Sequence, residues 1–163
     1  MKNYILDKTL ALRKLERMAL EIAERNTDAG YIVLAGIRES GSIMAAKLLP
    51  MLQKVFTGKI DVVKIVLDKK HPDIVTIGPE IDFNDKVVIL VDDVASSGKT
   101  MTYALKPLLE FYPQKIQTLV LVERTHKIFP IHPDYVGLSI ATTLQEHIFV
   151  ETENDDITGA YLA

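Results

Sequence analysis

The chain alternates between short continuous apolar runs and segments in which apolar residues recur every three or four positions. Residues 8–26 are of the second kind and predict an amphipathic helix. Its apolar face is formed by positions 15, 18, 19, 22 and 23. Asp7 is a suitable N-cap, and the polar stretch that leads to Gly30 ends the helix.

The continuous apolar runs predict buried strands, because a strand covered on both faces has no alternation of apolar and polar residues. These runs are residues 31–37, 60–67, 87–91 and 117–122, and shorter strands are expected near 134–138 and 146–151. The acidic stretch 151–156 is expected to be solvated.

Further helices are predicted between these strands. They cover residues 42–56, with a kink or break at Pro50, and about 98–112, whereas the polar residues 68–80 predict a long loop or a loose hairpin. Strands that alternate with helices predict an α/β fold with a mostly parallel central sheet flanked by helices. A length of 163 residues fits one domain, 1–163.

Composition narrows the class of protein. The chain has 19 basic and 22 acidic side chains, a net charge of −3, which excludes a strongly basic nucleic-acid binder of the histone type. The absence of cysteine excludes a disulfide scaffold, a thiolate nucleophile and a cysteine zinc site. No apolar run approaches the ~18–20 residues that span a membrane, and charges interrupt the N-terminal segment. We therefore expect a cytoplasmic protein without membrane contact.

The segment Val87–Thr100 is the most informative in chemical terms. A buried strand ends in Asp92 and Asp93, a loop with two serines and Gly98 follows, and a helix then begins. Open α/β sheets bind ligands at the carboxyl ends of their strands, and a helix start with hydroxyls and free N–H groups suits a phosphate. Two carboxylates would repel a phosphate alone, so they indicate ribose hydroxyls or Mg²⁺ shared with the phosphates.

Two other interpretations of this segment remain open from the residues alone. One is a strand–turn–helix unit with a serine cap and solvated aspartates. The other is a P-loop, because Gly98-Lys99-Thr100 matches the end of that motif. Asp93 occupies the position of the first P-loop glycine, and a carboxylate there argues against wrapping a polyphosphate.

The segment VVILVDDVASSGKT resembles the phosphoribosyl-diphosphate (PRPP) motif of type I phosphoribosyltransferases. The resemblance implies that family's fold, with a small hood formed by the terminal segments. It also implies that Asp92 and Asp93 contact the ribose hydroxyls or the metal around them. The residues that would cradle the 5′-phosphate are Ser96, Ser97, Gly98, Lys99 and Thr100.

A second anion site is suggested where strand 31–37 leads into a helix. The residues there are Arg38, Glu39, Ser40 and Gly41. The residues alone fit either an anion site or a simple turn with an exposed arginine. The family resemblance implies that this is the pyrophosphate loop, which often has a strained peptide bond.

Residues 118–143 are similar to the corresponding segment of the bifunctional pyrimidine-operon attenuator and uracil phosphoribosyltransferase proteins. The similar residues include Arg124, Asp134-Tyr135-Val136-Gly137 and Thr142-Thr143. The implied reaction is uracil plus PRPP giving UMP and pyrophosphate, with Mg²⁺ held indirectly at Asp92 and Asp93 through ribose and pyrophosphate. The base would lie against Val136, Gly137 and Arg124.

The chain departs from this family pattern at three places. The closing loop lacks its usual arginine, unless Lys69 or Lys70 replaces it, Leu138 stands in place of a lysine, and Thr125 replaces a glycine. Ser96 lacks the carboxylate that 6-oxopurine enzymes use at this position, which favours a pyrimidine.

Two alternative functions stay open. They are a nucleotide-sensing RNA-binding regulator of pyrimidine genes with weak or no catalysis, and a PRPP-dependent enzyme for another base. RNA binding is disfavoured because acidic residues lie among the basic residues of helix 8–26. The resemblance also suggests a homo-oligomer, a dimer or a tetramer.

Overall fold

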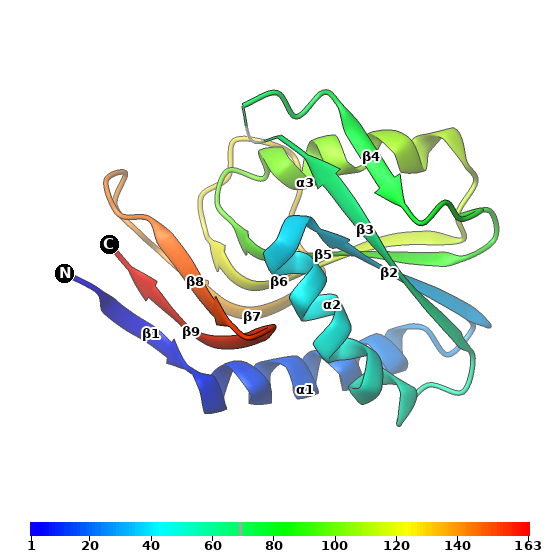
Figure 1. Cartoon of the computed structure of the whole chain (residues 1–163), viewed down its shortest axis with the longest axis horizontal. Helices are drawn as coiled ribbons and strands as arrows, with labels where there is room; N and C mark the ends of the chain where they lie inside the picture. Colours follow the sequence, from blue (N-terminus) through cyan, green and yellow to red (C-terminus); the bar gives the residue numbers. More distant parts are fainter. Residues whose placement is uncertain (69) are drawn as a thin grey trace.

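The computed structural model describes residues 1–68 and 70–163, and its largest feature is a six-stranded sheet (Figure 1). The strand order is β4-β3-β2-β5-β6-β7, and every neighbouring pair is parallel except β3 and β4. The bounds are β2 Tyr31–Ile37, β3 Lys59–Leu67, β4 Val75–Gly78, β5 Val87–Ala95, β6 Lys115–Arg124 and β7 Tyr135–Ile140. The predicted α/β class and mostly parallel sheet are confirmed.

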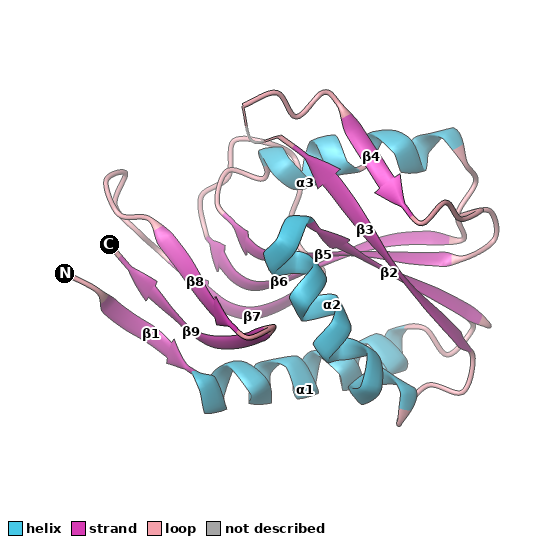
Figure 2. Ribbon diagram, viewed as in Figure 1, coloured by secondary structure: helices cyan, strands magenta, loops and turns pink. Residues whose placement is uncertain are grey.

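Helices cover both faces of this sheet (Figure 2). Helices α1 (Lys8–Arg25) and α2 (Arg38–Gln53) pack on one face, while α3 (Lys99–Ala104) and the 3-10 helix η1 (Lys106–Glu110) pack on the other. The alternation along β2 shows the reason: Ile32 and Leu34 belong to the first core, and Val33 and Ala35 belong to the second. Because side chains on both faces of the strand are buried, its sequence is a continuous apolar run.

A second sheet forms a hood beside the first (Figure 1). It is antiparallel, with the order β1-β9-β8, and its strands are β1 Asn3–Asp7, β8 Ile148–Glu153 and β9 Asp156–Leu162. The two ends of the chain therefore pair with each other in this sheet. A small hood from the terminal segments was expected, but β1 and β9 were not predicted as strands.

The acidic stretch 151–156 forms the end of the β8–β9 hairpin, and its residues 152–155 are exposed, as expected. Asn154 and Asp155 have φ of 52° and 57°, the left-handed values that a tight two-residue hairpin turn requires. Asp156 lies 2.7 Å from the Lys8 ammonium and 3.0 Å from the Lys47 ammonium. These contacts tie the hairpin to α1 and α2.

The predicted helices differ from the structure mainly at their ends. Asp7 caps α1 as predicted, since its Oδ1 accepts from the Leu10 N–H at 2.8 Å. Helix α2 begins at Arg38, four residues before the predicted start, and Pro50 lies inside it. The helix predicted over 98–112 is divided into α3 and η1, because Pro107 has no N–H and disfavours α-helical backbone at the residue before it.

The polar segment 68–80 contains β4, so the expected loose hairpin is present. The possible arginine replacement at Lys69 lies outside the described residues, and Lys70 is exposed. Within the described ranges, the structure has no helix with the length and apolar character needed to cross a bilayer.

Candidate functional site

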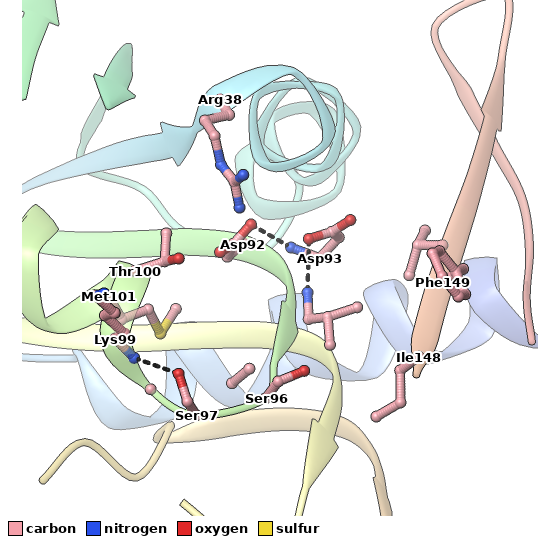
Figure 3. Close-up of a pocket in the computed structure, with 14 residues that line it drawn as sticks. Arg38, Asp92, Asp93, Ser96, Ser97, Lys99, Thr100, Met101, Ile148 and Phe149 are labelled. Carbon is pink, nitrogen blue, oxygen red and sulfur yellow. Dashed lines mark hydrogen bonds between the residues drawn. The ribbon is translucent and has the colours of Figure 1, made fainter. Parts of the chain in front are cut away.

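A cavity of about 310 Å³ lies where the carboxyl end of β5 meets α2, α3 and the hood (Figure 3). Its walls come from Arg38, the end of β5, the segment 96–101 and the β8 residues 148–150. Strands β2 and β5 are parallel, so their carboxyl ends lie at the same edge of the sheet. The polar residues at the end of β5 and in the loop after it therefore lie beside the start of α2, which follows β2. The sequence predicted this placement for β5 but not the contribution of β8.

Asp92 and Asp93 lie on β5 itself, which extends four residues beyond its predicted end. The Asp92 Oδ1 accepts the Asp93 N–H at 2.9 Å, and the Asp93 Oδ1 accepts the Val94 N–H at 2.8 Å (Figure 3). Asp92 is only 1% exposed, whereas Asp93 is half-buried. The two adjacent carboxylates therefore have different environments within one cavity.

Burial raises the pKa of the Asp92 carboxyl well above its ordinary value, and the neighbouring Asp93 carboxylate raises it further. The Arg38 guanidinium opposes both effects, because its positive charge favours the ionised carboxylate. Figure 3 shows the Arg38 side chain reaching toward Asp92. The Asp92 Oδ2 and the Arg38 Nε are both buried without a hydrogen-bond partner in the described part of the chain. Two such atoms in one cavity indicate a polar ligand that would complete their bonding.

Arg38 stands at a sharp corner between β2 and α2. Its φ of 55° is unusual for a residue with a side chain and costs about 1 kcal/mol. The backbone strain therefore lies at Arg38, in the first turn of α2, rather than in a separate loop. Gly41 permits this corner, since a Cβ there would lie 2.4 Å from the Val91 carbonyl oxygen. The expected loop at residues 38–41 is thus the first turn of α2, joined directly to β2 and packed on β5.

The segment Ser96–Thr100 curves around the cavity below the two aspartates (Figure 3). The Ser97 Oγ accepts the Lys99 N–H at 3.2 Å, and Gly98 has a φ of 84°. Gly98 also passes close to a neighbouring segment, because a Cβ there would lie 3.3 Å from the Phe129 carbonyl oxygen. A glycine is therefore required at this bend for both its conformation and its space.

Residues 127–129, to which the sequence analysis assigned no role, support this bend from behind. The Ile128 and Phe129 N–H groups both donate to the Ser97 carbonyl, at 3.1 and 3.0 Å. Just before them, the Lys127 ammonium donates to Glu123 at 2.6 Å and to the Arg124 carbonyl at 3.1 Å. The Lys127 side chain is only 3% exposed, so a buried ion pair anchors the support. The two residues are four positions apart, with Glu123 near the end of β6 and Lys127 in the irregular segment after it, and this pair has no sequence signature.

The remaining predicted site residues do not line this cavity. Glu39 is exposed and forms an ion pair with Lys64 of β3, and Ser40 is half-buried in the first turn of α2. Gly41 lies against β5, beside the Asp92 backbone. The structure therefore brings Arg38 to the carboxylates and leaves Glu39 at the surface.

The predicted base region lies on β6 and β7. The Val136 and Gly137 carbonyls accept hydrogen bonds from the Arg17 guanidinium of α1, at 3.0 and 3.1 Å. Arg124 donates to the Glu146 carbonyl at 2.7 Å, and its Nε is buried without a partner among the described residues. Their role in holding a base stays a prediction.

The residues present are compatible with a substrate-bound Mg²⁺. The described residues contain no cluster of three or more side chains that could ligate a metal. Mg²⁺ is commonly held by one or two carboxylates together with substrate phosphates and water. The half-buried Asp93 and the unpartnered Asp92 oxygen supply that small donor set.

A family model described as "Phosphoribosyl transferase domain" matches residues 2–156 of this chain. The chain belongs to the phosphoribosyl transferase domain family. This phosphoribosyltransferase is 34% identical to the "Bifunctional protein PyrR" of Macrococcus caseolyticus, over 99% of this chain and 98% of the relative. It is 37% identical to the protein of the same name from Streptococcus pneumoniae, over 93% and 91%.

Solved structures confirm the predicted fold of this phosphoribosyltransferase. A hypoxanthine phosphoribosyltransferase of Trypanosoma cruzi aligns with a TM-score of 0.80 at 16% identity, over 96% of this chain and 95% of the other. A hypoxanthine-guanine phosphoribosyltransferase of Bacillus anthracis aligns with a TM-score of 0.75 at 19% identity, over 98% of each chain. At such low identity the likeness concerns the fold.

Proposed function

We propose that this phosphoribosyltransferase transfers the phosphoribosyl group of PRPP to uracil and so produces UMP and pyrophosphate. The observation that carries the proposal is the single cavity that unites Arg38, the Asp92–Asp93 pair and the Ser96–Thr100 bend. Such a cavity combines a cation for a departing anion, acceptors for ribose hydroxyls and a curved backbone for a phosphate. The relatives named PyrR, at 34–37% identity, support a pyrimidine substrate.

Each group has a distinct part in the proposed reaction. The Ser96–Thr100 bend holds the 5′-phosphate, and the half-buried Asp93 accepts from a ribose hydroxyl. Arg38 lies near the pyrophosphate, and the unpartnered Asp92 Oδ2 forms a hydrogen bond with a second ribose hydroxyl. Mg²⁺, held through substrate oxygens beside Asp92 and Asp93, would supply positive charge for the departing pyrophosphate. No protein nucleophile is needed, because binding and orientation bring the base to C1.

The location of the base follows from the same arrangement. The β8 residues 148–150 of the hood form one wall of the cavity, and we place the base on the side of the ribose that faces this wall. Val136, Gly137 and Arg124 are proposed to contact the base or to support that contact. Ser96 offers a hydroxyl where a carboxylate would serve a 6-oxopurine, so uracil is proposed over hypoxanthine or guanine.

The proposal extends to the organisation of the molecule. Residues 1–163 act as one domain, since the hood and the main sheet line the same cavity. We place the protein in the cytoplasm and propose a homo-oligomer. RNA regulation is the second candidate, favoured by the word "bifunctional" in the relatives' name. The basic residues of α1 argue against that helix as the RNA surface, because Arg17 and Arg25 donate to carbonyls at the β7 edge.

UMP formation tests the proposal directly. Purified protein is incubated with PRPP, MgCl₂ and uracil, with hypoxanthine, guanine and adenine in parallel. Turnover is expected with uracil, and Asp93→Asn is expected to lower kcat about 10- to 100-fold, since a neutral amide oxygen accepts from the ribose hydroxyl more weakly than a carboxylate does. Asp85→Asn is the matched control, because Asp85 is exposed at the opposite end of β5. Turnover with a purine in place of uracil contradicts the base assignment, and no turnover with any base contradicts the activity.

A further inference from the structure

A groove of about 530 Å³ lies between the edge strand β4 and the end of η1, and it shares no lining residue with the candidate site. Residues 80–83, which follow β4, complete its lining. Figure 2 shows β4 at the edge of the main sheet, across the molecule from the hood. The groove is therefore a surface feature that the proposed reaction does not use.

The lining of this groove is mainly apolar. Val75 and Ile77 are two residues apart on β4, so their side chains lie on the same face of the strand, and both line the groove. The rings of Phe83 and Phe111 meet edge to face beside them, with centroids 5.3 Å apart. An adjoining hollow of about 290 Å³ continues this surface to Ile74, which is 69% exposed. A contiguous exposed apolar surface is typical of a site that binds another protein.

Strand β4 also has one side that is not paired. It is the last strand in the order of the main sheet, and its register is with β3 alone. Among the described residues, no backbone group outside β3 forms a hydrogen bond with residues 75–78. The outer side of β4 therefore presents free N–H and C=O groups beside the groove, and such an edge can accept a further strand.

The charged side chains that line the groove all have the same sign. They are Glu80, Asp82 and Glu110, which we call the acidic rim, and all three are exposed. Within the part of the chain that the structure describes, none of them forms an ion pair. Lys106 lines the adjoining hollow, but its ammonium donates to the Asp73 carbonyl at 3.0 Å. The acidic rim is therefore complementary to a basic ligand.

The same charges argue against a second copy of this chain on the β4 edge. Pairing of two β4 strands about a two-fold axis would bring identical surfaces together, so the two acidic rims would face each other. Like charges that face each other across an interface destabilise it. A basic segment of a different protein is attracted to the rim instead.

We propose that this groove binds an extended basic segment of another protein, which adds to the free side of β4 as a further strand. Two apolar residues of the segment, two positions apart, enter the groove. Lysines and arginines that flank them reach the acidic rim with their long side chains. The main-chain bonds to β4 provide affinity for any extended segment, while the groove and the rim select its apolar and basic residues.

Fluorescence anisotropy with a labelled peptide tests the proposal. The probe is the end-blocked peptide KRVTVTRK, and its control VKRTTRKV has the same composition without the two-residue spacing of the valines. KRVTVTRK is expected to bind about 10-fold more tightly than VKRTTRKV, because only its valines can enter the groove together. Equal binding of the two peptides, or no binding of KRVTVTRK, overturns the proposal.

Charge reversal locates the binding surface. Glu80→Lys/Glu110→Lys is expected to weaken binding of KRVTVTRK about 10-fold or more, since two attractions become repulsions. Glu16→Lys/Glu24→Lys is the matched control, because it makes the same change of charge at two exposed positions of α1. Equal losses in the two variants would mean that the peptide responds only to net charge, which overturns the site. A change in the oligomeric mass of Glu80→Lys/Glu110→Lys in sedimentation would assign the groove to a second copy and would also overturn it.

Modified peptides test the added strand itself. One version of KRVTVTRK carries N-methyl groups on both valines, and another carries them on both threonines. The N–H groups of alternate residues face the same neighbouring strand, so one version should bind about 10-fold more weakly than the other. Equal binding of the two versions refutes strand addition. These measurements need no turnover, so their outcome is independent of the proposed function.

Discussion

The buried Lys127–Glu123 pair permits a quantitative prediction about what supports the phosphate bend. The Lys127 side chain is 3% exposed and that of Glu123 is 17% exposed. In Lys127→Met a side chain of similar length fills the space, but Glu123 loses its cation and keeps only the Ser139 hydroxyl, which donates to it at 2.6 Å. The Arg124 carbonyl also loses a donor.

The magnitude follows from this inventory. Removing one partner of a fully buried pair costs about 3–5 kcal/mol, and the remaining exposure of Glu123 and its bond from Ser139 reduce that figure to about 2–3 kcal/mol. For a chain of this length the midpoint of thermal unfolding should fall by about 5–10 °C. The double variant Glu123→Gln/Lys127→Met removes both charges and should recover most of the loss.

The pH dependence gives a second signature. Burial opposes ionisation of Glu123, but the bonds from Lys127 and Ser139 outweigh it, so the pKa of Glu123 is lowered from its ordinary 4.5. In the wild type, this stabilisation is present above pH 4.5 and is lost as the pH falls through the lower folded-state pKa. In Lys127→Met the carboxyl has burial without the cation and its pKa rises. The variant's deficit should therefore shrink as the pH falls toward 4.5, because the carboxyl can then be protonated.

Chemical denaturation of the three proteins at several pH values measures these quantities. Lys64→Met is the matched control, because its partner Glu39 has a side chain that is 81% exposed and such pairs contribute about 0–1 kcal/mol. If Lys127→Met loses no more stability than Lys64→Met, or if the double variant is as unstable as the single one, the pair is not the anchor described above.

Two further predictions concern the junctions around the site. Gly41→Ala should lower the free energy of unfolding by about 2–3 kcal/mol and also lower the rate of UMP formation, because the added Cβ meets the Val91 carbonyl beside Asp92. Gly30→Ala is the control, because the space around its Cβ is open, and it should change little in thermal unfolding and activity assays. The pKa of Asp156 is lowered from 3.8 to about 2 by its bonds to Lys8 and Lys47, so its stabilisation is present above pH 3.8 and is lost toward pH 2. Asp156→Asn should flatten the fall in unfolding midpoint over that range, while Asp155→Asn in the neighbouring turn position should not, and identical pH curves would contradict the role of the two lysines.

The central sheet was predictable because its strands carry local signals. Continuous apolar runs located β2 to within its exact ends and β5 at its first residue. The end of β5 was missed because Asp92 and Asp93 are polar and have low strand propensity, yet pairing with β6 extends the strand through them. The motif nevertheless placed both carboxylates at the carboxyl edge, because adding four strand residues does not change which edge they reach.

The hood was less predictable because its pairing joins the two ends of the chain. Asn3 pairs with Leu162, and a local sequence pattern cannot predict a strand partner about 160 positions away. The β8–β9 turn did carry a local signal, since Asn154-Asp155 lies between strand-like residues and both types tolerate left-handed backbone. The high charge of residues 151–156 concealed it.

This difference in predictability separates two parts of the candidate site. The Asp92–Asp93 pair and the Ser96–Thr100 bend lie close together in the sequence, so a short sequence motif predicts both of them. The β8 residues 148–150 reach the same cavity only because β8 pairs with β9, and β9 with β1. A shift of one residue in that pairing would exchange the side chains on the two faces of the hood. The phosphoribosyl end of the site is therefore fixed by local sequence, and the proposed base end is fixed by the register of a sheet closed by the chain termini.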